Sequence, residues 1–161
     1  MKKYLLLILT GFLLVVSCSK DEGTSLEKGL VGKWIFDNEA SISQKQYTEL
    51  YRNFYPDATI DETIYHNPAN MAYGQWIFSD HEVSWFYKYV SGKTQSNHGS
   101  YRIQDDNILY VGATPYNIIE LNKDKLTIQI CGDTVYFYDE NYEKQIAWEE
   151  MWTLVLNKEE L

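Results

Sequence analysis

The sequence predicts an all-β protein, an antiparallel up-and-down barrel of about eight strands with a short helix between the first and second strands. Three observations predict this class. From Ala72 onward, apolar and polar residues alternate at the period of two that is typical of half-buried strands. Polar turns interrupt the pattern roughly every ten residues, and such short connections favour a meander over a Greek-key sandwich. Closure of the meander into a barrel would also remove its unpaired edges.

The composition allows one folded domain and excludes several classes of protein. The chain has 161 residues, of which 45% are hydrophobic, so it can form a core and is not a disordered acidic tail. With 3 prolines and 2 cysteines, it is neither proline-rich nor a disulfide framework. The net charge of -9 argues against a nucleic-acid partner, which needs a cationic surface. The unusual feature is an aromatic content of 16%.

The N-terminal segment has the pattern of a lipoprotein signal peptide, which we assign to residues 1–17. Two lysines precede an apolar stretch from Leu5 to Val16, which is shorter than the roughly 20 residues of a membrane-spanning helix. The stretch ends in Val-Val-Ser-Cys, which resembles a lipobox. We therefore expect cleavage before Cys18 and attachment of acyl chains to its thiol. An ordinary signal peptide with an incidental cysteine is the alternative.

The residues after Cys18 predict where the protein is located. Ser19-Lys20-Asp21-Glu22 resembles the surface-export signal of some Gram-negative lipoproteins, although a solvated charged tether has the same composition. We expect residues 18–28 to be a lipidated flexible tether and residues 29–161 to be the barrel domain. The predicted location is the bacterial outer membrane, with the domain anchored by lipid and exposed at the cell surface.

The first part of the domain contains the predicted helix. Residues 30–36 are expected to form the first strand. From Ser43 to Phe54, aromatic and aliphatic residues recur at spacings of three and four, which is the stripe of an amphipathic helix. Pro56 is expected to end that helix.

The remaining strands follow from the alternation after Ala72. Gly132-Asp133 is interpreted as a turn between two of them, and residues 91–97 as a loop. The expected strands cover residues 73–78, 83–89, 99–103, 108–111, 116–121, 126–130, 134–138 and 151–156.

Several short motifs resemble a known family. Gly32-Lys33-Trp34 in the first strand resembles the start of lipocalins, and the run from Leu30 to Trp34 is similar to bacterial lipocalin-like lipoproteins. The resemblance extends over residues 29–158 through Gly99–Ile103, Tyr116–Leu121, Lys125–Ile128 and Met151–Leu156. It implies that Trp34 packs across a closed barrel end, where a basic residue stacks on it. Only Lys158 is basic there, and we expect it to fall after the last strand.

The aromatic residues supply the candidate binding site. If they point inward, they would line a barrel interior that holds packed side chains or one small ligand, and ligand binding would need a cavity of about 300 Å³. Core packing and outward stacking platforms are the alternatives. The candidates for the cavity are Trp34, Trp85, Tyr87, Tyr101 and Trp152, and the candidates for a lid on the helix are Tyr47, Tyr51 and Phe54.

No catalytic or metal-binding pattern is present in the sequence. His66, His81 and His98 are far apart and are expected in loops or turns, and the metal-binding spacings of histidine and cysteine pairs are missing. No nucleophile motif or phosphate-binding loop occurs either. We therefore predict no enzyme activity, no cofactor and no metal.

The leading hypothesis is a lipid-anchored barrel that binds a small apolar or amphipathic molecule. The alternative is a surface interaction protein with a solid core, which contacts a glycan or an outer-membrane protein through exposed aromatic residues.

Overall fold

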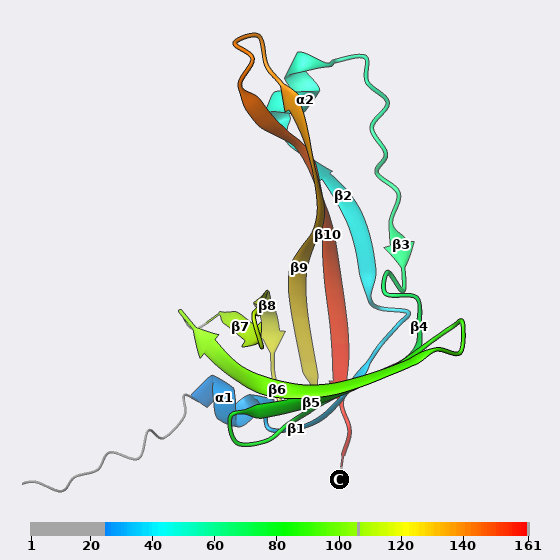
Figure 1. Ribbon diagram of the computed structural model, residues 1–161, viewed down its shortest axis with the longest axis vertical. Coiled ribbons are helices and arrows are strands. Elements are labelled where there is room, and N and C mark those ends of the chain that lie inside the picture. The colour runs from blue at the N-terminus through cyan, green and yellow to red at the C-terminus, as the bar shows by residue number, and fades with distance from the viewer. Residues whose placement is uncertain (1–24, 106, 161) are drawn as a thin grey trace, which may run out of the picture.

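The computed structural model describes residues 25–105 and 107–160. Within these residues, the chain forms a single sheet of ten strands and two short helices (Figure 1). In chain order they are α1 (Ser25–Leu30), β1 (Gly32–Phe36), β2 (Ile42–Tyr47), α2 (Glu49–Phe54), β3 (Tyr65–His66), β4 (Met71–Phe78), β5 (Glu82–Tyr89), β6 (Thr94–Gln104), β7 (Ile108–Val111), β8 (Thr114–Leu121), β9 (Lys125–Tyr138) and β10 (Lys144–Lys158).

Eight of the strands close into an antiparallel barrel, as the sequence predicted. Strands β4 to β10 follow one another as a meander, and β1 pairs with both β4 and β10. Trp34 lies opposite Trp76 of β4 on one side and opposite Lys158 of β10 on the other. The helix α2 lies between β1 and β4, in the long connection that the sequence assigned to it.

Part of the sheet extends beyond the barrel. The C-terminal part of β10 pairs with β1, whereas residues 148–153 pair with β2. Strand β2, helix α2 and residues 131–151 form an extension that we call the arm. In Figure 1 the arm rises above the barrel, with α2 beside the tip of the β9–β10 hairpin.

Two predicted strands merge into β9. The expected turn at Gly132-Asp133 is wrong, because β9 continues through it with a shift of register against β10 between Glu149 and Met151. A β-bulge bends a strand and leaves its pairing intact on both sides. A glycine beside an aspartate is compatible with either a bulge or a turn, and the pairing partner decides between them.

The predicted helix is shorter than its apolar stripe. Residues 43–47 belong to β2, so Tyr47 lies on a strand, because pairing with β10 outweighs the local helical spacing. Thr48 caps α2, since its hydroxyl accepts a hydrogen bond from the Tyr51 amide at 3.2 Å. The helix ends at Phe54, two residues before Pro56, as expected.

Helix α1 covers one end of the barrel. Leu30 is fully buried, and Gly29 lies against Leu121 of β8. Of the predicted tether, the structure describes only residues 25–28, and these are helical. The first strand begins at Gly32. The predicted signal peptide, Cys18 and the rest of the tether lie outside the described residues.

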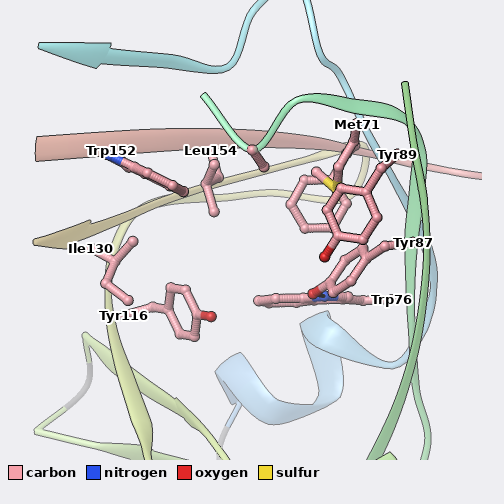
Figure 2. A pocket seen from close by; sticks show the side chains of 10 residues that line it. Met71, Trp76, Tyr87, Tyr89, Tyr116, Ile130, Trp152 and Leu154 are labelled. Carbon is pink, nitrogen blue, oxygen red and sulfur yellow. Dashed lines mark hydrogen bonds between the residues drawn. The ribbon is translucent and has the colours of Figure 1, made fainter. Parts of the chain in front are cut away.

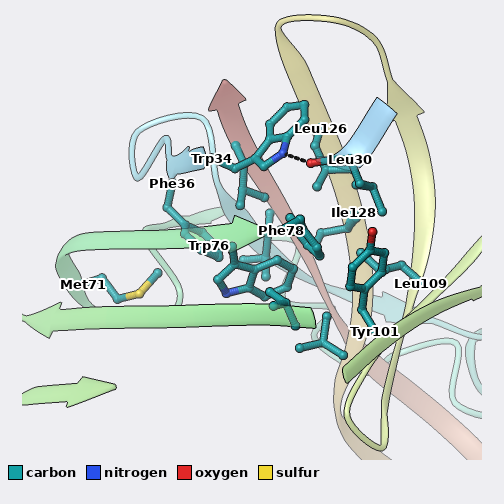
Figure 3. Close-up of a cluster of buried hydrophobic side chains, with 14 residues drawn as sticks. Leu30, Trp34, Phe36, Met71, Trp76, Phe78, Tyr101, Leu109, Leu126 and Ile128 are labelled. Atoms are coloured by element: carbon teal, nitrogen blue, oxygen red, sulfur yellow. Dashed lines mark hydrogen bonds between the residues drawn. The ribbon is translucent and has the colours of Figure 1, made fainter. Parts of the chain in front are cut away.

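The buried core extends from Leu30 of α1 to Met71 of β4 (Figure 3). Trp34, Trp76 and Phe78 are its largest fully buried side chains. Aliphatic residues from α1, β7, β9 and β10 surround them, namely Leu30, Leu109, Leu126, Ile128, Leu154 and Leu156. Among the described residues, no helix is long and apolar enough to span a membrane.

Candidate functional site

The barrel interior contains a mainly apolar cavity on the side away from α1. Its volume is about 180 Å³, and it is partly open to solvent. Figure 2 shows the side chains around it, which come from β1, β4, β5, β8, β9, β10 and the loop before β4. They are Phe36, Ala69, Met71, Trp76, Tyr87, Tyr89, Tyr116, Ile130, Trp152 and Leu154.

Aromatic rings pack edge to face at the inner end of the cavity. The Trp76 ring lies 5.4 Å from the ring of Phe36 and 5.4 Å from that of Tyr116, both in T-shaped geometry. Its indole nitrogen donates a hydrogen bond of 2.6 Å to the Tyr87 hydroxyl. Contacts of this kind fix ring orientations, so this wall of the cavity is preorganised.

Three phenol groups point into the space. Figure 2 shows the hydroxyls of Tyr87, Tyr89 and Tyr116 directed toward the middle of the cavity. Burial raises the pKa of the Tyr87 and Tyr116 hydroxyls above the ordinary tyrosine value of 10.0, because it disfavours the charged phenolate. Both groups are therefore neutral hydrogen-bonding groups at physiological pH.

The cavity is smaller than the ligand-binding hypothesis required. Its volume of about 180 Å³ falls short of the expected value of about 300 Å³. Apolar cavities of about 150 Å³ can hold a molecule the size of benzene. The cavity therefore does not reach the size that the ligand-binding hypothesis set, and the space suits only a single-ring molecule or the end of a longer one.

Two of the five predicted cavity residues line this space. They are Tyr87 and Trp152. The buried indole nitrogen of Trp152 has no hydrogen-bond partner among the described residues, and Figure 2 shows it directed away from the cavity. The ring carbons of Trp152 therefore form the wall.

The other three predicted cavity residues belong to the core. Trp34 is fully buried, Tyr101 is buried with its hydroxyl donating to the Ser79 carbonyl at 3.1 Å, and Trp85 packs partly buried against the same cluster. Their positions agree with core packing, which was the alternative to lining a cavity.

The closed end has the arrangement that the family resemblance implied. Lys158 is the last residue of β10, not a residue beyond it, and its ammonium nitrogen lies 5.0 Å from the centre of the Trp34 ring. The same nitrogen donates to the Gly29 carbonyl at 3.2 Å, and the Trp34 indole donates to the Leu30 carbonyl at 2.6 Å. The expected end of the last strand was too early, because pairing with β1 continues through Lys158.

The three lid candidates lie in the arm and do not line the cavity. Tyr47 packs against Trp148 of β10, whereas Tyr51 and Phe54 pack against Phe137 of β9, with ring-centre distances of 5.4 Å each to Phe137. Together these residues hold α2 against the β9–β10 hairpin.

Sequence reasoning missed most of the cavity lining. Tyr89 lies two residues after Tyr87 and four after Trp85 in β5, so the three side chains share one face of the strand. Alternation could therefore have identified Tyr89 as a lining residue. Trp76 and Tyr116 lie in strands that were predicted, but which face of each strand points inward depends on pairing across the barrel. Ala69 lies in an irregular loop with no signal of its own.

Candidate metal ligands are not clustered in the part of the chain that the structure describes. No group of three or more histidine, cysteine, aspartate or glutamate side chains among them could hold a metal ion. His81 lies in a turn as expected, whereas His66 lies in β3 and His98 in β6.

The fold and the cavity define a class, a closed antiparallel β-barrel with a small internal pocket lined by aromatic residues. Known proteins add nothing to this definition, because the sequence matches no model of a protein family and no curated protein matches it significantly.

Proposed function

We propose that this protein is a lipid-anchored, lipocalin-like protein of the bacterial outer membrane that binds a small apolar or amphipathic molecule inside its barrel. The observation that carries the proposal is the partly open cavity, with its aromatic and aliphatic lining. Burial of apolar ligand surface contributes about 25 cal/mol per Å², so even a single ring gains useful binding energy there. With about 180 Å³ available, only a compact ligand fits entirely.

The ligand should be found on protein taken directly from cells. Native mass spectrometry of the cell-extracted full chain should detect a co-purifying small molecule. In the variant Ala69→Phe, a larger side chain enters the cavity, and the bound molecule should be lost. Ala113→Phe is the matched control, because Ala113 is exposed in the turn between β7 and β8, outside the lining. Equal amounts of bound molecule in both variants, or no molecule in the wild type, would argue against binding in the barrel.

The anchor rests on the sequence around Cys18. Cys18→Ala removes the thiol that would carry the acyl chains, so we expect a soluble or uncleaved precursor in cell fractionation. Cys131→Ala is the control, since Cys131 lies exposed on the arm. Unchanged membrane association of the Cys18 variant would refute the lipobox interpretation. Protease treatment of intact cells then tests exposure at the cell surface.

Exposed aromatic residues on the arm favour a second candidate function, contact with a glycan or an outer-membrane protein. Tyr138 is 63% exposed and Tyr142 is 87% exposed at the tip of the β9–β10 hairpin. This candidate ranks second because it was expected with a solid core, whereas the barrel contains a cavity. A photo-crosslinker at position 142 in intact cells should give a discrete adduct, and one at Ala113 should not. The absence of an adduct at position 142 would remove this candidate.

A further inference from the structure

The hydrogen-bonding groups of the cavity define the chemical class of its ligand more closely than the shape of the cavity does. Trp76 already donates to the oxygen of Tyr87, so that oxygen accepts and its own proton stays available. Tyr89 donates its proton to the Gln95 side chain at 3.0 Å. The Tyr116 hydroxyl makes no hydrogen bond to any described residue, although its ring is fixed against Trp76. The cavity thus offers two uncommitted phenol donors, from Tyr87 and Tyr116.

The lining contains no ionisable group other than tyrosine. Lysine, arginine and histidine are missing from it, so a carboxylate or phosphate would lose its hydration without a compensating cation. Aspartate and glutamate are missing too, so an ammonium group would find no carboxylate to pair with in the lining. The lining therefore disfavours charged ligands. The two phenols can donate hydrogen bonds to an uncharged acceptor.

We infer that the cavity selects an uncharged, single-ring-sized molecule that carries a carbonyl oxygen, which accepts a hydrogen bond from Tyr116 and from Tyr87. This inference rests on the proposed function, since it names the ligand class for the same cavity. The phenols stay protonated well into the alkaline range, because burial raises the pKa of both. A neutral hydrogen bond left unmade in this setting costs a ligand about 2- to 10-fold in affinity.

Three probes of similar size separate the contributions of shape, hydrogen bonding and charge. They are acetophenone with a neutral carbonyl, ethylbenzene without one, and benzoate with a negative charge. Calorimetric titration of the lipid-free protein purified after Cys18→Ala should give the highest affinity for acetophenone. Ethylbenzene should bind about 2- to 10-fold more weakly, and benzoate should be weakest at pH 7.

The variant Tyr116→Phe tests the assigned donor. It keeps the ring that packs on Trp76 and leaves Tyr87 as the remaining donor, so acetophenone should lose part of its advantage while ethylbenzene binds unchanged. Tyr142→Phe is the matched control, because its exposed hydroxyl lies on the arm outside the cavity lining, and it should preserve the preference for acetophenone. The carbonyl stretching band of bound acetophenone should lie at lower frequency in the wild type than in Tyr116→Phe, because each hydrogen bond to the carbonyl lowers this frequency.

The outcomes distinguish the inference from the proposed function. If ethylbenzene and acetophenone bind equally and Tyr116→Phe changes neither, the inference is wrong and binding in the cavity stands. If benzoate binds best, the exclusion of charge is wrong. If no probe binds and native protein carries no molecule, the proposed function fails, and the inference fails with it.

Discussion

The barrel end covered by α1 explains why the first strand has glycine at position 32, two residues before Trp34. Gly32 has φ of +130°, a conformation that side chains with a Cβ rarely adopt. A Cβ at this position would lie 2.7 Å from Cε of Lys158. Gly32 therefore leaves room for the lysine stem that reaches over Trp34 toward the Gly29 carbonyl.

The variant Gly32→Ala should lower the free energy of unfolding by about 2 to 4 kcal/mol, from backbone strain and the lost stacking of Lys158 on Trp34. Urea denaturation measures this change. Gly112→Ala is the matched control, because Gly112 has φ of +60° but nothing within 4 Å of its added Cβ, and it should cost about 1 kcal/mol. Equal losses in the two variants would contradict the role given to Lys158.

At the scale of elements, the Thr48 side chain is one of the links between α2 and the sheet of the arm. The Thr48 hydroxyl donates to the Ile146 carbonyl at 2.8 Å and accepts from the Tyr51 amide at 3.2 Å. A helix of six residues is too short to be stable alone, so α2 needs this link and its aromatic contacts with Phe137.

Replacing Thr48 with valine should destabilise α2 locally by about 1 kcal/mol, because it removes both hydrogen bonds while keeping the shape. Amide hydrogen exchange in α2 should then be faster by about 5- to 10-fold, and exchange at Ile128 in the barrel should not change. Thr48→Ser keeps the hydroxyl and should exchange like the wild type. Faster exchange throughout the barrel would show that the arm is not an independent element.

For the whole molecule, the buried phenols connect stability to pH. Their pKa values are raised in the folded state, so the folded protein holds these protons more tightly than the unfolded chain does. The stabilisation is complete below the unfolded tyrosine pKa of about 10 and is lost as the pH rises above it.

The unfolding free energy should therefore fall above pH 10, and Tyr116→Phe should reduce the steepness of this fall. Chemical denaturation from pH 8 to 11.5 measures both slopes. Tyr142→Phe, at an exposed position outside the cavity, should keep the wild-type slope. A wild-type slope in Tyr116→Phe would show that the Tyr116 phenol is not held neutral by the fold.

Much of the barrel could be predicted because its signals are local. The alternation from Tyr73 to Leu156, the polar turns and the helix stop at Pro56 each depend on neighbouring residues, and they gave the fold class and most strands. The errors arose where a distant strand decided the structure. Residues 43–47 became a strand by pairing with β10, and Gly132 became part of a bulge for the same reason.

The sequence by itself determined the fold class, the order of the strands and the supply of aromatic side chains. Only the tertiary structure decided which aromatics line the cavity, that Lys158 covers Trp34, and that the cavity is about 180 Å³. The physical reason is that alternation fixes two faces for each strand. Barrel closure, register and bulges then determine which face is inside and which side chains meet there.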